Sequence, residues 1–318
     1  MRPTDTLSRR AVVQGGLAVG ASLALDPQLA FGAAAGGAPI LRTIPSSGEK
    51  LPVIGIGTNA FGVTDPAEVA NRKAVLQGMP AQGMKVVDTA RGYGTSEEVI
   101  GRLVKEIGNR KDLFIASKTP LPGPNGDVSG GKAVLDVSFQ RLQVDVIDLL
   151  EIHNFNGLDE LMPHLLEYKQ AKKIRYIGAT TSVDNDHPRL IEAMKKHKLD
   201  FIQVNYSIAD RESADAVLPY ALANGVAVLN NVPFGGRGRS LFPKVQGKEI
   251  PAFAKELGIT SWAQFMLKYN LSHPAITVAI PGTTTLEHLR DNLAGGRGRL
   301  PDAALRRRME QYWDALPG

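Results

Sequence analysis

Four polar side chains follow consecutive apolar segments of the sequence, and together their types could deliver a proton to a carbonyl oxygen. Asp88 ends the segment "KVVD", Tyr93 follows it, Lys118 ends "LFIASK", and His153 ends "VIDLLEIH". A tyrosine has an ordinary pKa of about 10, and a nearby lysine ammonium stabilises its phenolate. We therefore expect Lys118, held by Asp88, to lower the pKa of Tyr93. His153 would orient the carbonyl.

The same set argues against other mechanisms. It offers no Ser-His-Asp nucleophile, the sequence has no cysteine, and its six histidines show no metal-ligand spacing. A carbonyl that takes a proton and meets no protein nucleophile needs a hydride, so we expect a nicotinamide cofactor and no metal. A sugar hydrolase would need paired carboxylates. Asp88 has Lys118 as its partner instead, and the sequence leaves open whether Glu151 points inward.

The segments that carry these residues alternate with helical patterns. Short apolar runs recur along the chain, and amphipathic stretches such as 65–81, 131–142, 158–172 and 213–224 separate them. About eight such units predict a parallel α/β sheet, and their span fits a closed (β/α)8 TIM barrel of about 250 residues. The first strand lacks the G-x-G-x-x-G turn of an open dinucleotide fold. In a barrel, the carboxyl ends of the strands share one mouth, which would gather the four side chains.

Three local patterns complete the expected fold. The segment "LRTIPSSGEKLPV" predicts an N-terminal β-hairpin, which we expect to close the bottom of the barrel. In "TSEEVIG", Thr95 and Glu98 predict a capping box at a helix start. Residues 231–251, after the seventh strand, predict a long functional loop.

Composition favours a folded protein with no nucleic-acid partner. Hydrophobic residues make up 43% of the 318 residues and charged residues 22%, which predicts a sizeable core. The formal net charge is +5, and no basic block is interleaved with aromatic residues.

The N-terminus has the order of an export signal. Arg9 and Arg10 precede an apolar run, and the small-residue segment "AFGAAAGGA" follows. The run is too short for a membrane span, which needs about 20 apolar residues. We expect residues 1–38 to be a twin-arginine signal peptide or disordered leader and residues 39–318 to be one barrel domain. The twin-arginine machinery would then export the folded protein to the periplasm.

Segments along most of the chain, from Leu41 onward, resemble the aldo-keto reductase family in order and spacing. They are "GIGTNAFG", "DTARGYGTSEEVIG", "ASKTP", "EIHNF", "IRYIGATTS", "QVNYS", "VPFGGRG" and "IPGTTTLEHLRDNL". The resemblance implies a barrel that binds NADP(H) across its carboxyl face and reduces an aldehyde or ketone, or oxidises the alcohol, as a monomer. It also implies Tyr93 as general acid, Asp88 and Lys118 as its tuning partners, and His153 as the orienting residue.

The resemblance further implies cofactor and substrate contacts. Thr180 and Thr181 match a polar pair, usually Ser-Asn, that holds the nicotinamide carboxamide. Gln203 matches a glutamine that contacts the same carboxamide. The other implied cofactor residues are Thr58, Pro233, Gly235, Gly236, Arg237, Gly282, Thr283, Thr284, Thr285, His288, Asp291 and Asn292. The implied substrate residues are Asn59, Phe61, Asn154 and Phe155.

Besides the threonine pair, the sequence departs from the family pattern at three positions. Asn231 stands where an aromatic residue stacks on the nicotinamide, and Gly282 and His288 stand where lysine and arginine often pair with the 2′-phosphate. The choice between NADP(H) and NAD(H) therefore stays open. A barrel that binds nucleotide or ligand without turnover is the alternative function. Since the cofactor is cytoplasmic, an exported enzyme would be loaded before export.

Overall fold

A computed structural model describes residues 37–120, 126–236 and 238–317. Residues 1–36, which hold most of the predicted export signal, and Arg237, a predicted cofactor residue, lie outside the described residues. Within the described ranges, no helix combines the length and apolar character that crossing a membrane requires.

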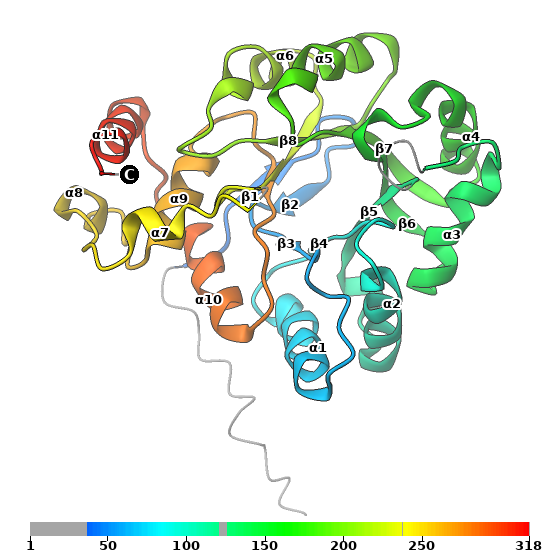
Figure 1. Ribbon diagram of the computed structural model, residues 1–318, viewed down its shortest axis with the longest axis horizontal. Coiled ribbons are helices and arrows are strands. Elements are labelled where there is room, and N and C mark those ends of the chain that lie inside the picture. The colour runs from blue at the N-terminus through cyan, green and yellow to red at the C-terminus, as the bar shows by residue number, and fades with distance from the viewer. Residues whose placement is uncertain (1–36, 121–125, 237, 318) are drawn as a thin grey trace, which may run out of the picture. The chain divides into compact units, whose positions relative to one another are not determined.

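Eight parallel strands form a barrel at the centre of Figure 1, and they follow one another around it in chain order. Their bounds are β3 Ile56–Gly57, β4 Val86–Asp88, β5 Phe114–Thr119, β6 Ile147–Ile152, β7 Ile174–Thr180, β8 Phe201–Asn205, β9 Ala227–Asn231 and β10 Val278–Ala279. The first and last strands close the ring. The amides of Gly55 and Gly57 donate to the carbonyls of Ala279 and Pro281, each at 2.9 Å. The predicted (β/α)8 barrel is confirmed.

Helices surround the barrel (Figure 1). The ring consists of α1 Pro66–Ala81, α2 Ser96–Ile107, α3 Lys132–Leu142, α4 Leu158–Gln170, α5 His187–Lys196, α6 Val217–Ala223, α9 Trp262–Leu271 and α10 Leu286–Gly295. Shorter or outlying helices are α7 Phe242–Val245, α8 Ala252–Lys255 and α11 Ala303–Asp314. Single 3-10 turns are η2 Arg110–Asp112, η3 His153–Phe155, η4 Asp184–Asp186 and η5 Glu212–Ala214. Apolar side chains between strands and helices form the main core.

Three local expectations need correction. Thr95 precedes α2, but its backbone lacks the extended conformation of a capping residue and its side chain makes no capping bond, so the capping box is wrong. The predicted helix at 213–224 begins only at Val217, because the preceding residues form η5. The segment 231–251 contains α7 and is not a continuous loop.

The N-terminal hairpin closes the amino end of the barrel, as predicted. Strands β1 (Leu41–Thr43) and β2 (Lys50–Pro52) pair antiparallel. Ile44 and Leu51 are fully buried and join the cluster inside the barrel that includes Phe114 and Phe201. Burial of Ile44 and Leu51 stabilises the packing of the hairpin against the barrel by about 1.5–3 kcal/mol for each side chain.

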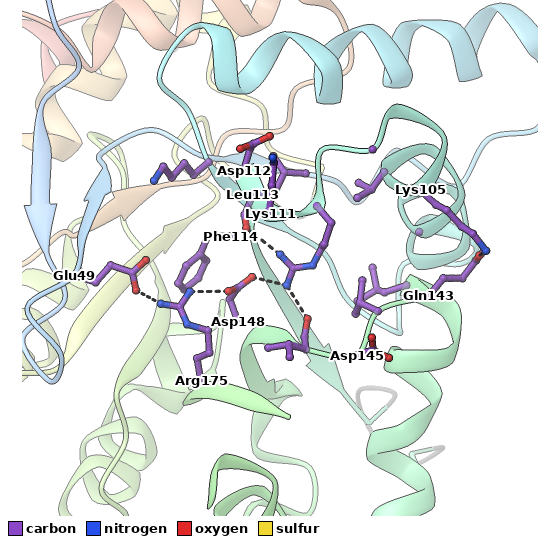
Figure 2. Close-up of a pocket in the computed structure, with 18 residues that line it drawn as sticks. Glu49, Lys105, Lys111, Asp112, Leu113, Phe114, Gln143, Asp145, Asp148 and Arg175 are labelled. Atoms are coloured by element: carbon purple, nitrogen blue, oxygen red, sulfur yellow. Dashed lines mark hydrogen bonds and ion pairs between the residues drawn. The ribbon is translucent and has the colours of Figure 1, made fainter. Parts of the chain in front are cut away.

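A pocket of about 630 Å³ beside the amino ends of β5 and β6 contains an ion-pair network (Figure 2). Asp148 Oδ2 accepts hydrogen bonds from Arg110 and the amide of Ile115, both at 2.8 Å, and its Oδ1 accepts from Arg175 at 2.7 Å. Arg175 also pairs with Glu49 of the hairpin. Because these groups satisfy one another far from the carboxyl ends of the strands, we assign the network a structural role.

Candidate active site

The four predicted catalytic side chains meet at the carboxyl end of the barrel. Asp88 ends β4 and Lys118 lies in β5, both nearly fully buried. Lys118 Nζ donates to both oxygens of Asp88, at 2.7 and 2.8 Å, and to the carbonyl of Thr89 at 2.7 Å. The ammonium also lies 5.0 Å from the centre of the Tyr93 ring. A buried ion pair thus lies directly against the phenol.

Main-chain hydrogen bonds fix the loop that carries Tyr93. The amide of Arg91 donates to the carbonyl of Lys118, and the amide of Tyr93 donates to that of Ala90, at 2.9 and 3.0 Å. Ser96, at the start of α2, anchors the other end: its amide donates to the Tyr93 carbonyl, and its hydroxyl donates to the carbonyl of Thr58 at 2.9 Å. Ser96 therefore anchors the start of α2, where the capping box was expected.

His153 completes the cluster from the end of β6. Its ring meets that of Tyr93 edge to face, with centroids 6.1 Å apart and an interplanar angle of 86°. The side chain is 9% exposed, and its Nδ1 has no hydrogen-bond partner among the described residues. Burial, reinforced by the charge of Lys118, lowers the pKa of His153 to about 3. The imidazole is therefore neutral at physiological pH.

Burial and neighbouring charges together determine the other pKa values of the site. It raises the pKa of Tyr93, and the charge of Lys118 opposes this without outweighing it. Lys118 therefore acts on Tyr93 in the predicted direction, but burial, which sequence motifs do not reveal, keeps the pKa of Tyr93 above its usual value. For Lys118, burial acts to lower the pKa, but Asp88, Tyr93 and Glu151 raise it above the usual value. The site holds a charged ammonium beside a neutral phenol.

Two residues predicted to contact the cofactor support Asp88 in this structure. Gln203 Nε2 donates to Asp88 Oδ1 at 2.8 Å. The hydroxyl and the amide of Thr58 both donate to the Asp88 carbonyl, at 2.8 and 3.0 Å. Their side chains are almost fully buried. Gln203 and Thr58 therefore fix the position of Asp88, which in turn binds the Lys118 ammonium.

The predicted carboxamide-binding pair lies at the end of β7. Thr180 Oγ1 accepts from the amide of Asn154 at 3.2 Å, and the carbonyl of Thr181 accepts from Asn231 Nδ2 at 2.9 Å. Asn231, the residue at the expected stacking position, is half-buried, and its Oδ1 has no partner among the described residues. An amide oxygen in need of a donor therefore stands beside the threonine pair.

The glycines after β9 form a tight turn beside a pocket of about 570 Å³. Gly235 has φ +86°, and a Cβ there would lie 2.1 Å from the carbonyl oxygen of Arg239. A Cβ on Gly236 would lie 2.6 Å from Cγ1 of Val232. Only glycine fits this turn. Pro233, by contrast, is buried, and its carbonyl accepts from Asn270.

The predicted adenosine-end residues gather at the start of α10. Thr285 caps the helix by accepting from the His288 amide at 3.3 Å, and Thr283 accepts from Asn292 at 3.0 Å. Asp291 accepts hydrogen bonds from Ser261 and Gln264. Gly282 and the His288 side chain are exposed, and Thr284 is half-buried.

The predicted substrate residues divide into two kinds. Asn59 is exposed and Asn154 half-buried, whereas Phe61 and Phe155 are 0% and 1% exposed and belong to the core. Asn154 and Phe155 have φ of 51° and 59°, an uncommon left-handed conformation for residues other than glycine. Backbone strain of this kind concentrates at functional sites.

Arg72 is a site residue that the sequence analysis did not identify. It is 5% exposed and donates to the carbonyls of Ala60 and Thr284, at 3.2 and 3.0 Å, and it pairs with Glu68. It therefore joins the loop after β3 to the segment before α10. Its position three residues before Val75, on the buried face of α1, is the one signal in the sequence.

Comparisons with known proteins agree with this geometry. A model of the aldo/keto reductase family matches residues 53–308. The chain is 32% identical over 208 residues to aldo-keto reductase YhdN of Bacillus subtilis (strain 168), which covers 59% of this chain and 60% of that protein. It is 27% identical over 301 residues to aldo-keto reductase yakc of Schizosaccharomyces pombe, and the matched region covers 81% of this chain and 87% of that protein. The name of this relative includes NADP(+).

A solved structure shows the same architecture. An aldo-keto reductase from Klebsiella pneumoniae in complex with NADPH superposes with a TM-score of 0.71 and 25% sequence identity, which covers 86% of this chain and 95% of that one. In the part of the chain that our structure describes, no group of three or more His, Asp or Glu side chains is arranged to hold a metal.

Proposed function

Because the chain belongs to the aldo/keto reductase family, we propose that it reduces an aldehyde or ketone to an alcohol with NADPH, Tyr93 acting as general acid. Membership makes the chain an oxidoreductase with a nicotinamide cofactor, and it excludes the alternative of a non-catalytic barrel. The proposal adds the roles of individual residues. Its main support is the buried Lys118–Asp88 pair against the Tyr93 ring.

The mechanism follows from the charges in the cluster. Tyr93, a neutral phenol, gives its proton to the carbonyl oxygen, and the Lys118 ammonium stabilises the phenolate that forms. Asp88 holds the ammonium in place. The neutral His153 forms a hydrogen bond to the same oxygen and orients the carbonyl. When bound, NADPH supplies the hydride that the carbonyl carbon takes up.

The residues at the mouth fit a nicotinamide dinucleotide. Asn231 Oδ1, which has no hydrogen-bond partner within the described ranges, lies beside the threonine pair and can accept from the carboxamide. The residues that would hold the nicotinamide half are Thr58, Thr180, Thr181 and Gln203. The turn at Gly235 and Gly236 borders the pocket where the pyrophosphate would lie. The adenosine half would contact the residues from Gly282 to Asn292, and the carbonyl substrate would contact Asn59 and Asn154.

We favour NADP(H) as the cofactor. The yeast relative carries NADP(+) in its name, and the Klebsiella structure contains NADPH. The exposed His288 lies at the position where the family often has an arginine that pairs with the 2′-phosphate. Since a histidine lacks the bidentate fork with which arginine binds phosphate, NAD(H) is the second candidate. Titration of the protein with each dinucleotide, followed by quenching of protein fluorescence, will rank their affinities.

Tyr93→Phe tests the role of the general acid. We expect this variant to lose carbonyl reduction while its NADPH affinity stays within about twofold, because only the proton donor is removed. Tyr220→Phe, which alters a half-buried phenol on α6, is the matched control and should keep wild-type activity. Full activity of Tyr93→Phe would contradict the assignment.

We also propose that residues 1–38 direct the folded barrel, residues 39–318, to the periplasm by the twin-arginine route, and that the enzyme acts as a monomer. The support is the order of Arg9, Arg10, apolar run and small residues. The cofactor would be loaded in the cytoplasm and retained. Replacing both arginines with lysine should leave the protein in the cytoplasmic fraction. Unchanged export, or periplasmic protein without nucleotide, would count against this proposal.

A further inference from the structure

One buried carboxyl inside the barrel has no part in the mechanism above. Glu151 lies in β6 with 0% of its surface exposed, and neither side-chain oxygen has a hydrogen-bond partner among the described residues. Burying a polar group without a partner costs stability, so such a group in a folded protein calls for an explanation.

The strand register places Glu151 beside the catalytic cluster. It pairs with Lys118 of β5 on one side and with Gly178 of β7 on the other. Residues in register on neighbouring strands point to the same face, so Glu151 points into the barrel as Lys118 does. A Cβ on Gly178 would lie 2.9 Å from Cγ of Glu151 and 3.0 Å from its Oε1. The glycine therefore leaves the space that the glutamate side chain fills.

Charged groups on two strands act on this carboxyl. Burial raises the pKa of Glu151 well above its usual value; Lys118 from β5 opposes this rise, and Asp88 from β4 adds to it. Gly178 of β7 contributes no charge. For Tyr93, burial comes first, followed by Lys118 and Asp88, and the charge of Glu151 then acts to raise its pKa further. Glu151 is thus electrostatically coupled to the proton donor without touching it.

We propose that Glu151 is a positioning residue for carbonyl reduction, whose charge acts on both Lys118 and Tyr93 and sets the alkaline limit of the reaction. This inference rests on the proposed function. When the carboxyl is ionised, its negative charge opposes formation of the Tyr93 phenolate and favours the charged form of Lys118. Tyr93 therefore keeps the proton that it must donate up to a higher pH.

Glu151→Gln removes the charge and keeps the shape of the side chain. We expect the alkaline limb of kcat/KM for reduction to move about one pH unit lower, because one unit charge near the phenol is lost. The neutral-pH rate should stay within about threefold of wild type, and NADPH affinity should not change. Glu151→Asp, which keeps a carboxyl, should restore part of the shift.

Glu97→Gln is the matched control. Glu97 is also 0% exposed, and its Oε2 has no hydrogen-bond partner among the described residues, but it lies on α2, accepts from Ser117 and has Arg141 3.9 Å from Oε2. Its variant should keep the wild-type pH profile. An equal shift in the Glu97 variant would indicate a general effect of altering buried carboxyls, and would overturn the specific role of Glu151.

A direct measurement covers the case in which the Glu151 variant is inactive. The ultraviolet absorbance of each protein is titrated with pH, and the titration curve of the same protein carrying Tyr93→Phe is subtracted. The difference follows the ionisation of the Tyr93 phenol alone and needs no turnover. A Tyr93 midpoint at lower pH in Glu151→Gln supports the inference, and an unchanged midpoint and alkaline limb overturn it. If wild type reduces no carbonyl with NADPH, the proposed function fails, and this titration still decides the coupling.

Discussion

Replacement of Lys118 by methionine gives the sharpest test of the site, because this lysine contributes to both stability and chemistry. Its Nζ lies 2.7 and 2.8 Å from the two oxygens of Asp88. At an effective dielectric constant of about 20, charges 2.7 Å apart attract by about 6 kcal/mol, and desolvation offsets part of this. Methionine leaves Asp88 buried with Gln203 and no cation, so we expect a loss of about 3–5 kcal/mol in unfolding free energy.

The same substitution should slow the chemical step. Without the ammonium, the phenolate of Tyr93 loses the positive charge that stabilises it, and general acid catalysis usually contributes about 10²–10⁴-fold in rate. Single-turnover hydride transfer, followed by loss of NADPH absorbance, measures this step apart from product release. A rate within about tenfold of wild type would refute the argument that Lys118 assists Tyr93.

Two further variants separate the effects of Lys118 on folding and on rate. Lys118→Met with Asp88→Asn removes both charges, so it should lose less stability than the sum of the single variants and recover none of the rate. Lys268 is the matched control, because it is also 1% exposed but donates to the carbonyls of Arg297 and Arg299. Lys268→Met should lower stability in urea unfolding and leave the single-turnover rate unchanged.

Three other predictions follow from the geometry. Burial raises the pKa of Tyr93 and lowers that of His153 to about 3, so both side chains stay neutral from about pH 5 to 9. The value of kcat/KM for reduction should therefore be flat over this range, and a titration of either group inside it would contradict the assignment. Asp148→Ala removes the acceptor of two arginines and one amide at the barrel bottom; it should cost about 2–3 kcal/mol in urea unfolding, with kcat unaltered at low temperature. Gly235→Ala should weaken NADPH binding, because the added Cβ displaces the turn. Gly238→Ala is the control: no atom lies within 4 Å of its added Cβ, so it should cost only about 1 kcal/mol of backbone strain and keep the NADPH affinity. Equal losses of affinity in both variants would show that crowding at the turn is irrelevant.

The sequence predicted the barrel and the meeting of the four polar residues because both depend on order along the chain. Alternation of strands and helices determines the fold class, and the end of each strand determines where Asp88, Lys118 and His153 lie. These features are local, and the structure confirms the barrel and shows the four side chains together.

The errors arose where a long-range contact decides the outcome. Thr95 has the sequence of a capping residue, yet Ser96 anchors the helix start, because its hydroxyl reaches Thr58, 38 positions away in the chain. The sequence predicted the direction in which Lys118 shifts the pKa of Tyr93 but missed the larger, opposing effect of burial, because burial depends on how the whole mouth packs. Gln203 supports Asp88 from 115 positions away, a contact that neither residue shows in its own segment.

The closure of the barrel has a consequence for local opening. The ring closes between β3 and β10, strands of only two residues each, through a few main-chain bonds from Gly55, Gly57 and Ala279. So short a ladder is the place where we expect transient separation of strands and the fastest amide hydrogen exchange in the ring. The predicted cofactor residues Thr58 and Gly282 flank this seam on opposite sides. A bound dinucleotide would therefore bridge the seam. At a dinucleotide concentration one hundred times the dissociation constant, the free energy of opening at the seam would rise by up to about 2.7 kcal/mol, and amide exchange there would slow accordingly.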